Sequence, residues 1–66
     1  MKGYLIELQN SRGEWNRPDL PIYIKCSFAI SQGHKLVKNH FTRACGYRVV
    51  NRANGDIEYE EIMRAA

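Results

Sequence analysis

Two histidines and two cysteines are the side chains in this sequence that could hold a metal ion or act as a nucleophile. His34 and His40 are six positions apart, so a helix would place them on different faces, away from the i, i+4 spacing of a helical zinc pair. Cys26 and Cys45 form no C-x-x-C motif. Cys45 and His40 would not share a helix face, and nothing beside them indicates an oxyanion pocket. We therefore predict no metal site and no cysteine nucleophile.

Three glutamates near the C-terminus could in principle supply a general acid and a general base. Glu58, Glu60 and Glu61 fall in a segment that we expect to be an exposed hairpin, where they can pair with Arg48 and Arg52. The glycines are scattered and build no phosphate-binding loop. We therefore predict that the chain is not an enzyme and that it requires no cofactor.

The remaining candidates are binding surfaces, and the first of them is basic. Lys35, Lys38 and Arg43 lie on the outer face of an expected helix, with Lys25 and Arg17 possible neighbours. Lysine and arginine contact phosphates as point charges and as planar forks. The alternative interpretation is an ordinary solvated helix face.

The second candidate surface is centred on Trp15, which lies between Arg12 and Arg17. Trp and Arg are the residue types most enriched at binding hot spots. The alternative is a tryptophan that folds back to close one end of a small core.

The third candidate surface is Val50 with a polar rim of Arg48, Arg52, Glu58 and Glu60 on the outer face of the last hairpin. Isolated exposed apolar residues are also common and without function. The three surfaces together give the candidate partner-binding residues Arg12, Trp15, Arg17, Lys35, Lys38, Arg43, Arg48, Val50 and Arg52.

One helix is expected to organise the chain, over Ser31–Gly46. Ser31 can cap its first turn, and Gly46 can end it in the left-handed conformation. Its apolar stripe is expected to consist of Leu36, Val37, Phe41, Ala44 and Cys45, and its polar face of Lys35, Lys38, Asn39, Thr42 and Arg43.

Alternating apolar residues predict strands on both sides of this helix. The expected strands are Gly3–Gln9, Pro21–Phe28, Tyr47–Arg52 and Ile57–Glu61, with a long loop over Asn10–Leu20 and a tail over Ile62–Ala66 that forms a half-turn of helix or frays. A single antiparallel sheet with the helix across one face covers the apolar side of both layers. We therefore predict an α+β fold of the order strand-strand-helix-strand-strand, in a single domain over residues 1–66.

Asn54-Gly55 is a strong hairpin signal between the last two strands. A two-residue turn would set apolar residues opposite glutamates. A turn with Gly55 as a left-handed bulge residue instead brings like residues together. The register that we predict pairs Val49 with Tyr59, Asn51 with Ile57, Arg52 with Asp56 and Arg48 with Glu60.

Composition limits the classes of function. A chain of 66 residues with a 44% apolar fraction is expected to fold, and ten basic against seven acidic residues leave a net charge of +3, which favours an anionic partner surface. The sequence has no apolar run long enough to span a membrane and no signal-peptide core, so we expect a cytoplasmic protein. Cys26 and Cys45 are expected to be reduced packing residues, with a disulfide as the alternative.

The order of the elements along most of the chain carries a resemblance. The chain opens with Met1-Lys2, continues with Tyr4-Leu5-Ile6-Glu7 in a strand and Asn10-Ser11-Arg12-Gly13 in a loop, and passes through one helix to a terminal hairpin. In this it resembles the small α/β inhibitors that phages and mobile elements encode, and most of all the anti-CRISPR proteins that act on type I surveillance complexes.

The resemblance implies a stoichiometric inhibitor that docks on a host protein or nucleoprotein complex in a bacterial cytoplasm, as a monomer or a homodimer. The positive net charge argues against an inhibitor that imitates DNA. Two other classes stay open. One is a small basic regulator that binds nucleic acid through the helix face, and the other is a module that dimerises by adding strands at a free sheet edge.

Overall fold

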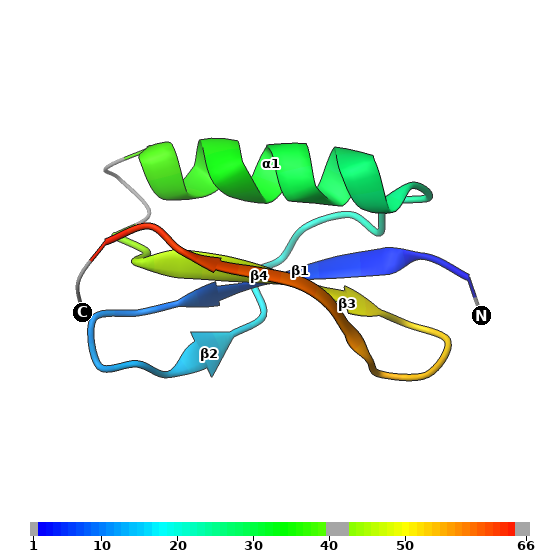
Figure 1. The fold of residues 1–66 in the computed structure, drawn as a ribbon, viewed down its shortest axis with the longest axis horizontal. Coiled ribbons are helices and arrows are strands. Elements are labelled where there is room, and N and C mark those ends of the chain that lie inside the picture. Colours follow the sequence, from blue (N-terminus) through cyan, green and yellow to red (C-terminus); the bar gives the residue numbers. More distant parts are fainter. Residues whose placement is uncertain (1, 40–42, 65–66) are drawn as a thin grey trace.

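The computed structural model describes residues 2–39 and 43–64 (Figure 1). Within these residues, four antiparallel strands form one sheet and one helix lies across one face of it, which confirms the predicted α+β class and the order of the elements. The elements are β1 (Tyr4–Gln9), β2 (Trp15–Asn16), α1 (Cys26–Lys38), β3 (Gly46–Asn51) and β4 (Ile57–Ile62).

The strand order is β2-β1-β3-β4, so β1 and β3 are central while β2 and β4 form the two edges. β1 pairs with β3 along its whole length, with Ile6 opposite Val49 and Glu7 opposite Arg48. Because side chains alternate between the faces of a sheet, every second residue of each central strand faces α1 and the residues between them face the opposite side.

The core lies between α1 and the two central strands. Ile6, Tyr47 and Val49 from the sheet and Val37 from the helix are almost completely buried. Ala29 and Gly33, the small residues of α1, let the helix approach the sheet closely, and Gly33 lies directly against the Tyr47 ring. Burial of this one apolar layer is the main source of stability available to so small a domain.

The start of the helix differs from the prediction. α1 begins at Cys26, and the strand predicted over Pro21–Phe28 is absent; only Tyr23 makes an isolated bridge, to Tyr4. Ser31 lies inside the helix and caps nothing, because the capping position is Lys25, which makes no capping bond through its side chain. The alternation of large apolar residues in this segment predicted a strand. The helix instead buries Ala29, a residue too small to stand out in that pattern.

The end of the helix also differs. α1 ends at Lys38, so Ala44 and Cys45 are buried in the connection to β3 and not on the helix. Phe41 and Thr42 of the predicted faces lie outside the described residues. Gly46 is instead the first residue of β3. A glycine is needed there because a Cβ would lie 2.7 Å from the carbonyl oxygen of Glu61 on the neighbouring strand. Its glycine therefore permits strand packing and does not end the helix.

Part of the predicted loop Asn10–Leu20 is a strand. β2 pairs with the end of β1, with Gln9 opposite Trp15. The turn before it is built by Asn10, whose Oδ1 accepts hydrogen bonds from the backbone N–H groups of Arg12 and Glu14, both at 2.9 Å. The asparagine and glycine signals of this segment mark a tight turn and not a long irregular loop.

The last hairpin confirms half of the predicted register. Val49 lies opposite Tyr59 and Arg48 opposite Glu60, as expected. Beyond this point Val50, and not Asn51, pairs with Ile57, so the extra residue of the bulge is Glu58 within β4. Gly55 is left-handed, with φ 78°, as predicted.

The predicted pair of Arg52 and Asp56 is wrong. The backbone N–H of Asn51 donates to the carbonyl oxygen of Asp56 at 2.8 Å, while the N–H of Arg52 donates to that of Gly3 at 3.0 Å. The bulge at Glu58 shifts the register by one residue, so Asn51, and not Arg52, is bonded to Asp56. Successive N–H groups of a central strand point to opposite neighbours, so the N–H of Arg52 points toward the β1 side.

Both cysteines are free, which confirms the prediction of reduced thiols, although Cys26 lies on α1 and not on a strand. Among the described residues there is no helix of the length and apolar character needed to cross a membrane.

Candidate binding surfaces

The histidines and cysteines considered for metal binding or catalysis do not come together in one site within the described residues. The ring of His34 meets that of Tyr47 edge-on at 6.2 Å, while His40 lies outside the described residues. Burial, and then the negative charge of Glu58, raise the pKa of the Cys26 thiol, which favours its protonated form. Within residues 2–39 and 43–64, no group of three or more His, Cys, Asp or Glu side chains gathers as it would around a metal ion.

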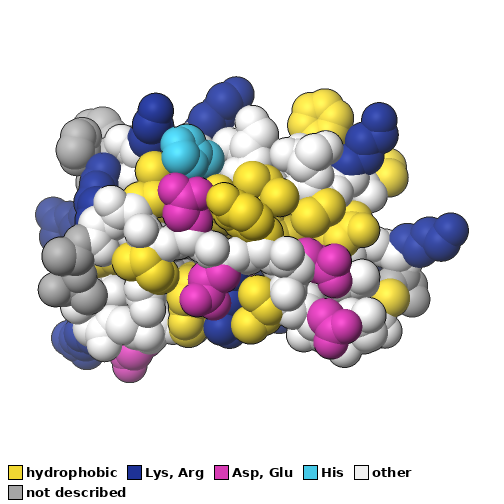
Figure 2. Space-filling view, in the orientation of Figure 1, with side chains coloured by type: hydrophobic (Ala, Val, Ile, Leu, Met, Phe, Trp, Pro, Cys, Tyr) yellow, Lys and Arg dark blue, Asp and Glu magenta, His cyan; other side chains and the backbone are white. Residues whose placement is uncertain are grey.

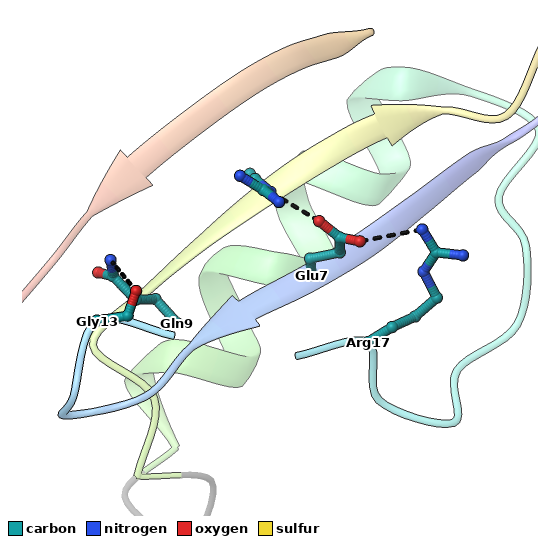
Figure 3. A network of polar contacts seen from close by, with 5 residues as sticks. Glu7, Gln9, Gly13 and Arg17 are labelled. Carbon is teal, nitrogen blue, oxygen red and sulfur yellow. Dashed lines mark hydrogen bonds and ion pairs between the residues drawn. The ribbon is translucent and has the colours of Figure 1, made fainter. Parts of the chain in front are cut away.

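Glu7 is the centre of a polar cluster on the sheet face opposite α1 (Figure 3). Its Oε1 accepts a hydrogen bond from Arg48 Nε at 2.7 Å, and its Oε2 accepts one from Arg17 Nη2 at 3.0 Å. The guanidinium of Arg48 also lies over the Trp15 ring, 4.4 Å from its centroid. We call Glu7, Arg17, Arg48 and Trp15 the Glu7 cluster.

Electrostatics stabilise the ionised form of Glu7. Burial alone would raise the pKa of this carboxyl, but the hydrogen bonds and positive charges of Arg48 and Arg17 together outweigh burial and lower it. The Glu7 side chain is only 13% exposed, whereas Arg17 is 57% exposed. The Arg48 side chain is 24% exposed, so Arg48 is the more protected partner and Arg17 lies on the solvent side of the cluster.

This cluster joins residues from different predicted surfaces. Arg17 was a possible neighbour of the basic helix face, yet it lies on the opposite side of the sheet. Trp15 is half-buried under the Arg48 guanidinium, on the sheet face away from α1, and it is not among the residues that pack on the core. Arg12 remains exposed in the turn between β1 and β2. Glu7 was missed because its partner Arg48 is opposite it only once β1 is known to pair with β3.

Replacing Glu7 with glutamine should lower the free energy of unfolding by about 1–2 kcal/mol at neutral pH, since two arginines lose their charged acceptor. Because the folded-state pKa of Glu7 is lowered, its contribution is present above the ordinary value of 4.5 and is lost as pH falls through the folded-state pKa. Urea unfolding of both proteins at neutral and acidic pH should show the difference shrinking toward low pH. Glu14→Gln, at an exposed turn position, is the control, and equal stability of wild type and Glu7→Gln at neutral pH would contradict the assignment.

The predicted patch around Val50 is not an exposed apolar centre. Val50 is 8% exposed and belongs to the buried residues. Arg52 is half-buried beside Gly3, and Arg48 is directed to Glu7. The interpretation of an apolar centre with a polar rim is therefore wrong, because Val50 lies on a central strand, between β1 and β4, with Leu5 opposite it on β1.

The basic helix face is present in part. Lys35 and Lys38 are exposed in the last turn of α1, and Arg43 is exposed beyond the helix with a positive φ of 56°. Lys25 is exposed at the other end of α1. Lysines in a last turn also interact favourably with the helix dipole, which is the structural alternative for this pair.

An exposed apolar surface lies where the sequence predicted a strand. Ile22 is 46% exposed, Ile24 89% and Phe28 65%. With Tyr23 and Lys25 they line a hollow of about 330 Å³. We call Ile22, Ile24 and Phe28 the apolar patch. A helical reading of the sequence from Cys26 onward would have found it, because the stripe through Ala29 and Gly33 leaves Phe28 on the outer face.

A second set of exposed apolar side chains belongs to β4, where Tyr59 lies beside the buried Tyr47 ring at 5.9 Å between centroids. Both hydroxyls donate to Glu61 Oε1, that of Tyr59 at 2.9 Å and that of Tyr47 at 3.4 Å. Burial, followed by the charge of Glu61 and by Tyr59, raises the pKa of Tyr47 to about 12. These phenols therefore stay protonated and act as donors that fix Glu61.

The chain matches no protein-family model, no curated protein and no solved structure. The exposed surfaces described above are therefore the features from which a function can be inferred.

Proposed function

We propose that this chain is a non-enzymatic inhibitor that docks on a host protein or nucleoprotein complex through the apolar patch. The observation that carries this proposal is the exposure of two large apolar side chains at the start of α1, Ile24 at 89% just before the helix and Phe28 at 65% in its first turn. Neither position contributes buried area to the core, so the fold gains little from an isoleucine and a phenylalanine there. Contiguous exposed apolar side chains are a mark of protein-interaction sites.

The polar surroundings of the patch favour a partner with an acidic rim. Lys25 lies beside Ile24, and Lys35 continues the same exposed helix face two turns beyond Phe28. An apolar centre with cations at its border suits a protein surface that is apolar in the middle and acidic around it. The resemblance of the sequence to anti-CRISPR proteins gives the class of target, a CRISPR surveillance complex in a bacterial cytoplasm.

The test is capture of partners by the tagged chain from bacterial lysate, with and without nuclease. The inhibitor proposal expects a defined protein complex that is retained in equal amount after nuclease treatment. Capture of many nucleic-acid-associated proteins that all disappear with nuclease would contradict it.

The exposure of Lys35 and Lys38 supports a second candidate, a small regulator that binds nucleic acid through α1. Neither lysine forms an ion pair with a carboxylate in the described part of the chain. Phosphate contacts by such lysines give affinity that falls steeply with salt.

The double variant Lys35→Glu with Lys38→Glu separates the two candidates. If α1 binds phosphates, this change should weaken binding to duplex and single-stranded DNA by about 100-fold or more and reduce the salt dependence. If the apolar patch is the contact, binding to the captured complex should fall by about tenfold at most, because rim charges mainly affect the association rate. Fluorescence anisotropy on labelled DNA, beside binding to the captured complex, measures both, with circular dichroism to verify the fold.

A further inference from the structure

The outer edge of β4 has no neighbouring strand among the described residues. The phase of its ladder follows from bonds at both ends, where Met63 N–H donates to the carbonyl oxygen of Cys45 and Asn51 N–H to that of Asp56, both at 2.8 Å. Hydrogen-bonded pairs alternate along an antiparallel ladder, so Glu61 bonds inward to β3. The backbone N–H and C=O groups of Glu60 and Ile62 therefore point outward, to where a further strand would lie.

β4 is also the least covered strand of the sheet. α1 packs on β1 and β3 and leaves β4 beyond its side. Ile57 is 51% exposed, Tyr59 38% and Ile62 50%. Figure 2 shows hydrophobic and acidic side chains together along this side of the molecule, below the helix. Tyr59 faces the α1 side of the sheet with Val49, while Ile57 faces the other side with Val50, so an added strand would find apolar neighbours on both of its faces.

The charge of this edge is opposite to that of the whole chain. Asp56, Glu58, Glu60 and Glu61 follow one another within six residues, and Ile57–Ile62 contains no lysine or arginine, although the net charge is +3. The nearest cross-strand cation, Arg48 opposite Glu60, is directed to Glu7 at 2.7 Å. The edge therefore presents four carboxylates within six residues, and the arginine opposite Glu60 is committed to Glu7.

A second copy of the chain fits this edge poorly. Antiparallel self-pairing centred on Tyr59 sets Glu58 opposite Glu60, and centring it on Glu60 sets two copies of that residue opposite each other. Like charges directly opposite in a sheet are destabilising. Charge complementarity selects a strand that carries lysine or arginine.

We propose that the outer edge of β4 accepts an extended basic segment of a partner protein as a fifth strand of the sheet. Backbone bonds to Glu60 and Ile62 would supply the pairing, and cations on the segment would meet the glutamates. This contact uses the backbone edge of β4 and none of the three residues of the apolar patch, so its tests are independent of those of the proposed function.

The probe is a short peptide with blocked ends that alternates lysine and valine, titrated into the purified chain. NMR should show shifts and slowed amide hydrogen exchange at Glu60 and Ile62, which point outward, with smaller changes at Tyr59 and Glu61, which already bond to β3. The same peptide methylated on alternate backbone nitrogens keeps its charge but loses one edge of donors. It should bind about tenfold more weakly or worse if strand addition holds it.

Two variants of the chain test the same point from the other side. Ile62→Pro removes an outward N–H that β3 does not use, a change that edge strands tolerate, and Glu60→Lys reverses the charge without touching the backbone. Each variant should weaken binding of the peptide by about tenfold or more. Glu14→Lys makes the same change of charge near the opposite edge and should leave the affinity for the peptide within about twofold of wild type.

Three results would overturn the proposal. The methylated peptide could bind as well as the original, Glu14→Lys could cost as much as Glu60→Lys, or sedimentation could show a dimer of the chain that Ile62→Pro dissociates. The last result would assign the edge to a second copy.

Discussion

Gly33→Ala is expected to lower the free energy of unfolding by about 1–3 kcal/mol, the range found for overpacked cores. In most helix interiors the same change raises stability by about 1 kcal/mol. Here a Cβ at position 33 would lie 2.5 Å from Cδ2 and 2.9 Å from Cγ of Tyr47. That ring is 1% exposed and is bounded by His34 and Tyr59, so it has little room to move.

Urea unfolding of wild type, Gly33→Ala and Ser31→Ala measures this effect. Ser31 is exposed on the same helix, so its replacement reports the helix propensity gained without a new contact. Removing the ring with Tyr47→Leu should make the change at Gly33 much less costly, which a double-mutant cycle would show as coupling. A Gly33→Ala protein as stable as wild type would mean that α1 does not rest on Tyr47 as described.

Ile24→Ser combined with Phe28→Ser is expected to weaken binding to the captured partner by about 100-fold or more, since truncation of central apolar anchors costs about 2 kcal/mol or more each. Stability should change little, because both side chains are mostly in solvent in the free chain. Affinity by surface plasmon resonance and melting temperature by circular dichroism test the two halves of this prediction.

The matched control for this pair is Ser27→Gln with Ser31→Gln, two exposed positions on the same helix. It should leave affinity within about threefold, as expected for substitutions outside an interface centre. A large loss of melting temperature in the Ile24 and Phe28 variant would show instead that these residues stabilise the fold.

The sequence predicted the parts of the fold that depend on strong local patterns. The strand at Tyr4–Gln9 alternates cleanly, and the pairing of Val49 with Tyr59 follows from matching apolar and charged residues across the hairpin. The bulge at Glu58 was not predictable in this way, because matching residue types across the hairpin assumed one register along the whole of both strands, and the register shifts by one residue beyond Val49.

The prediction of a strand over Pro21–Phe28 was wrong for a different reason. Ile22, Ile24, Cys26 and Phe28 alternate as a strand would, but the helix buries Ala29 and Gly33, two residues too small to register as an apolar stripe. The choice between the two periods was decided by close packing against Tyr47 and not by local preference. The apolar patch is the direct result, since side chains predicted to face the core are the ones left outside.

For the candidate surfaces, the sequence predicted the exposure of single residues but not the contacts between residues that are distant in the chain. Lys35, Lys38 and Arg12 are exposed as expected. The Glu7 cluster needed the pairing of β1 with β3 and the return of the chain through β2, both of which are contacts between distant segments. Arginines that looked available in the sequence are therefore partly committed to a carboxylate inside the molecule.

The most direct test of the central claim, docking through the apolar patch, is a parallel capture from one nuclease-treated bacterial lysate. Tagged wild type and the tagged Ile24→Ser, Phe28→Ser variant, both verified as folded, are the two baits, and quantitative mass spectrometry compares what each retains. We expect a defined set of proteins held by wild type and depleted about tenfold or more from the variant. Retention of the same proteins in equal amounts by both baits would contradict the claim and exclude the patch as the binding surface.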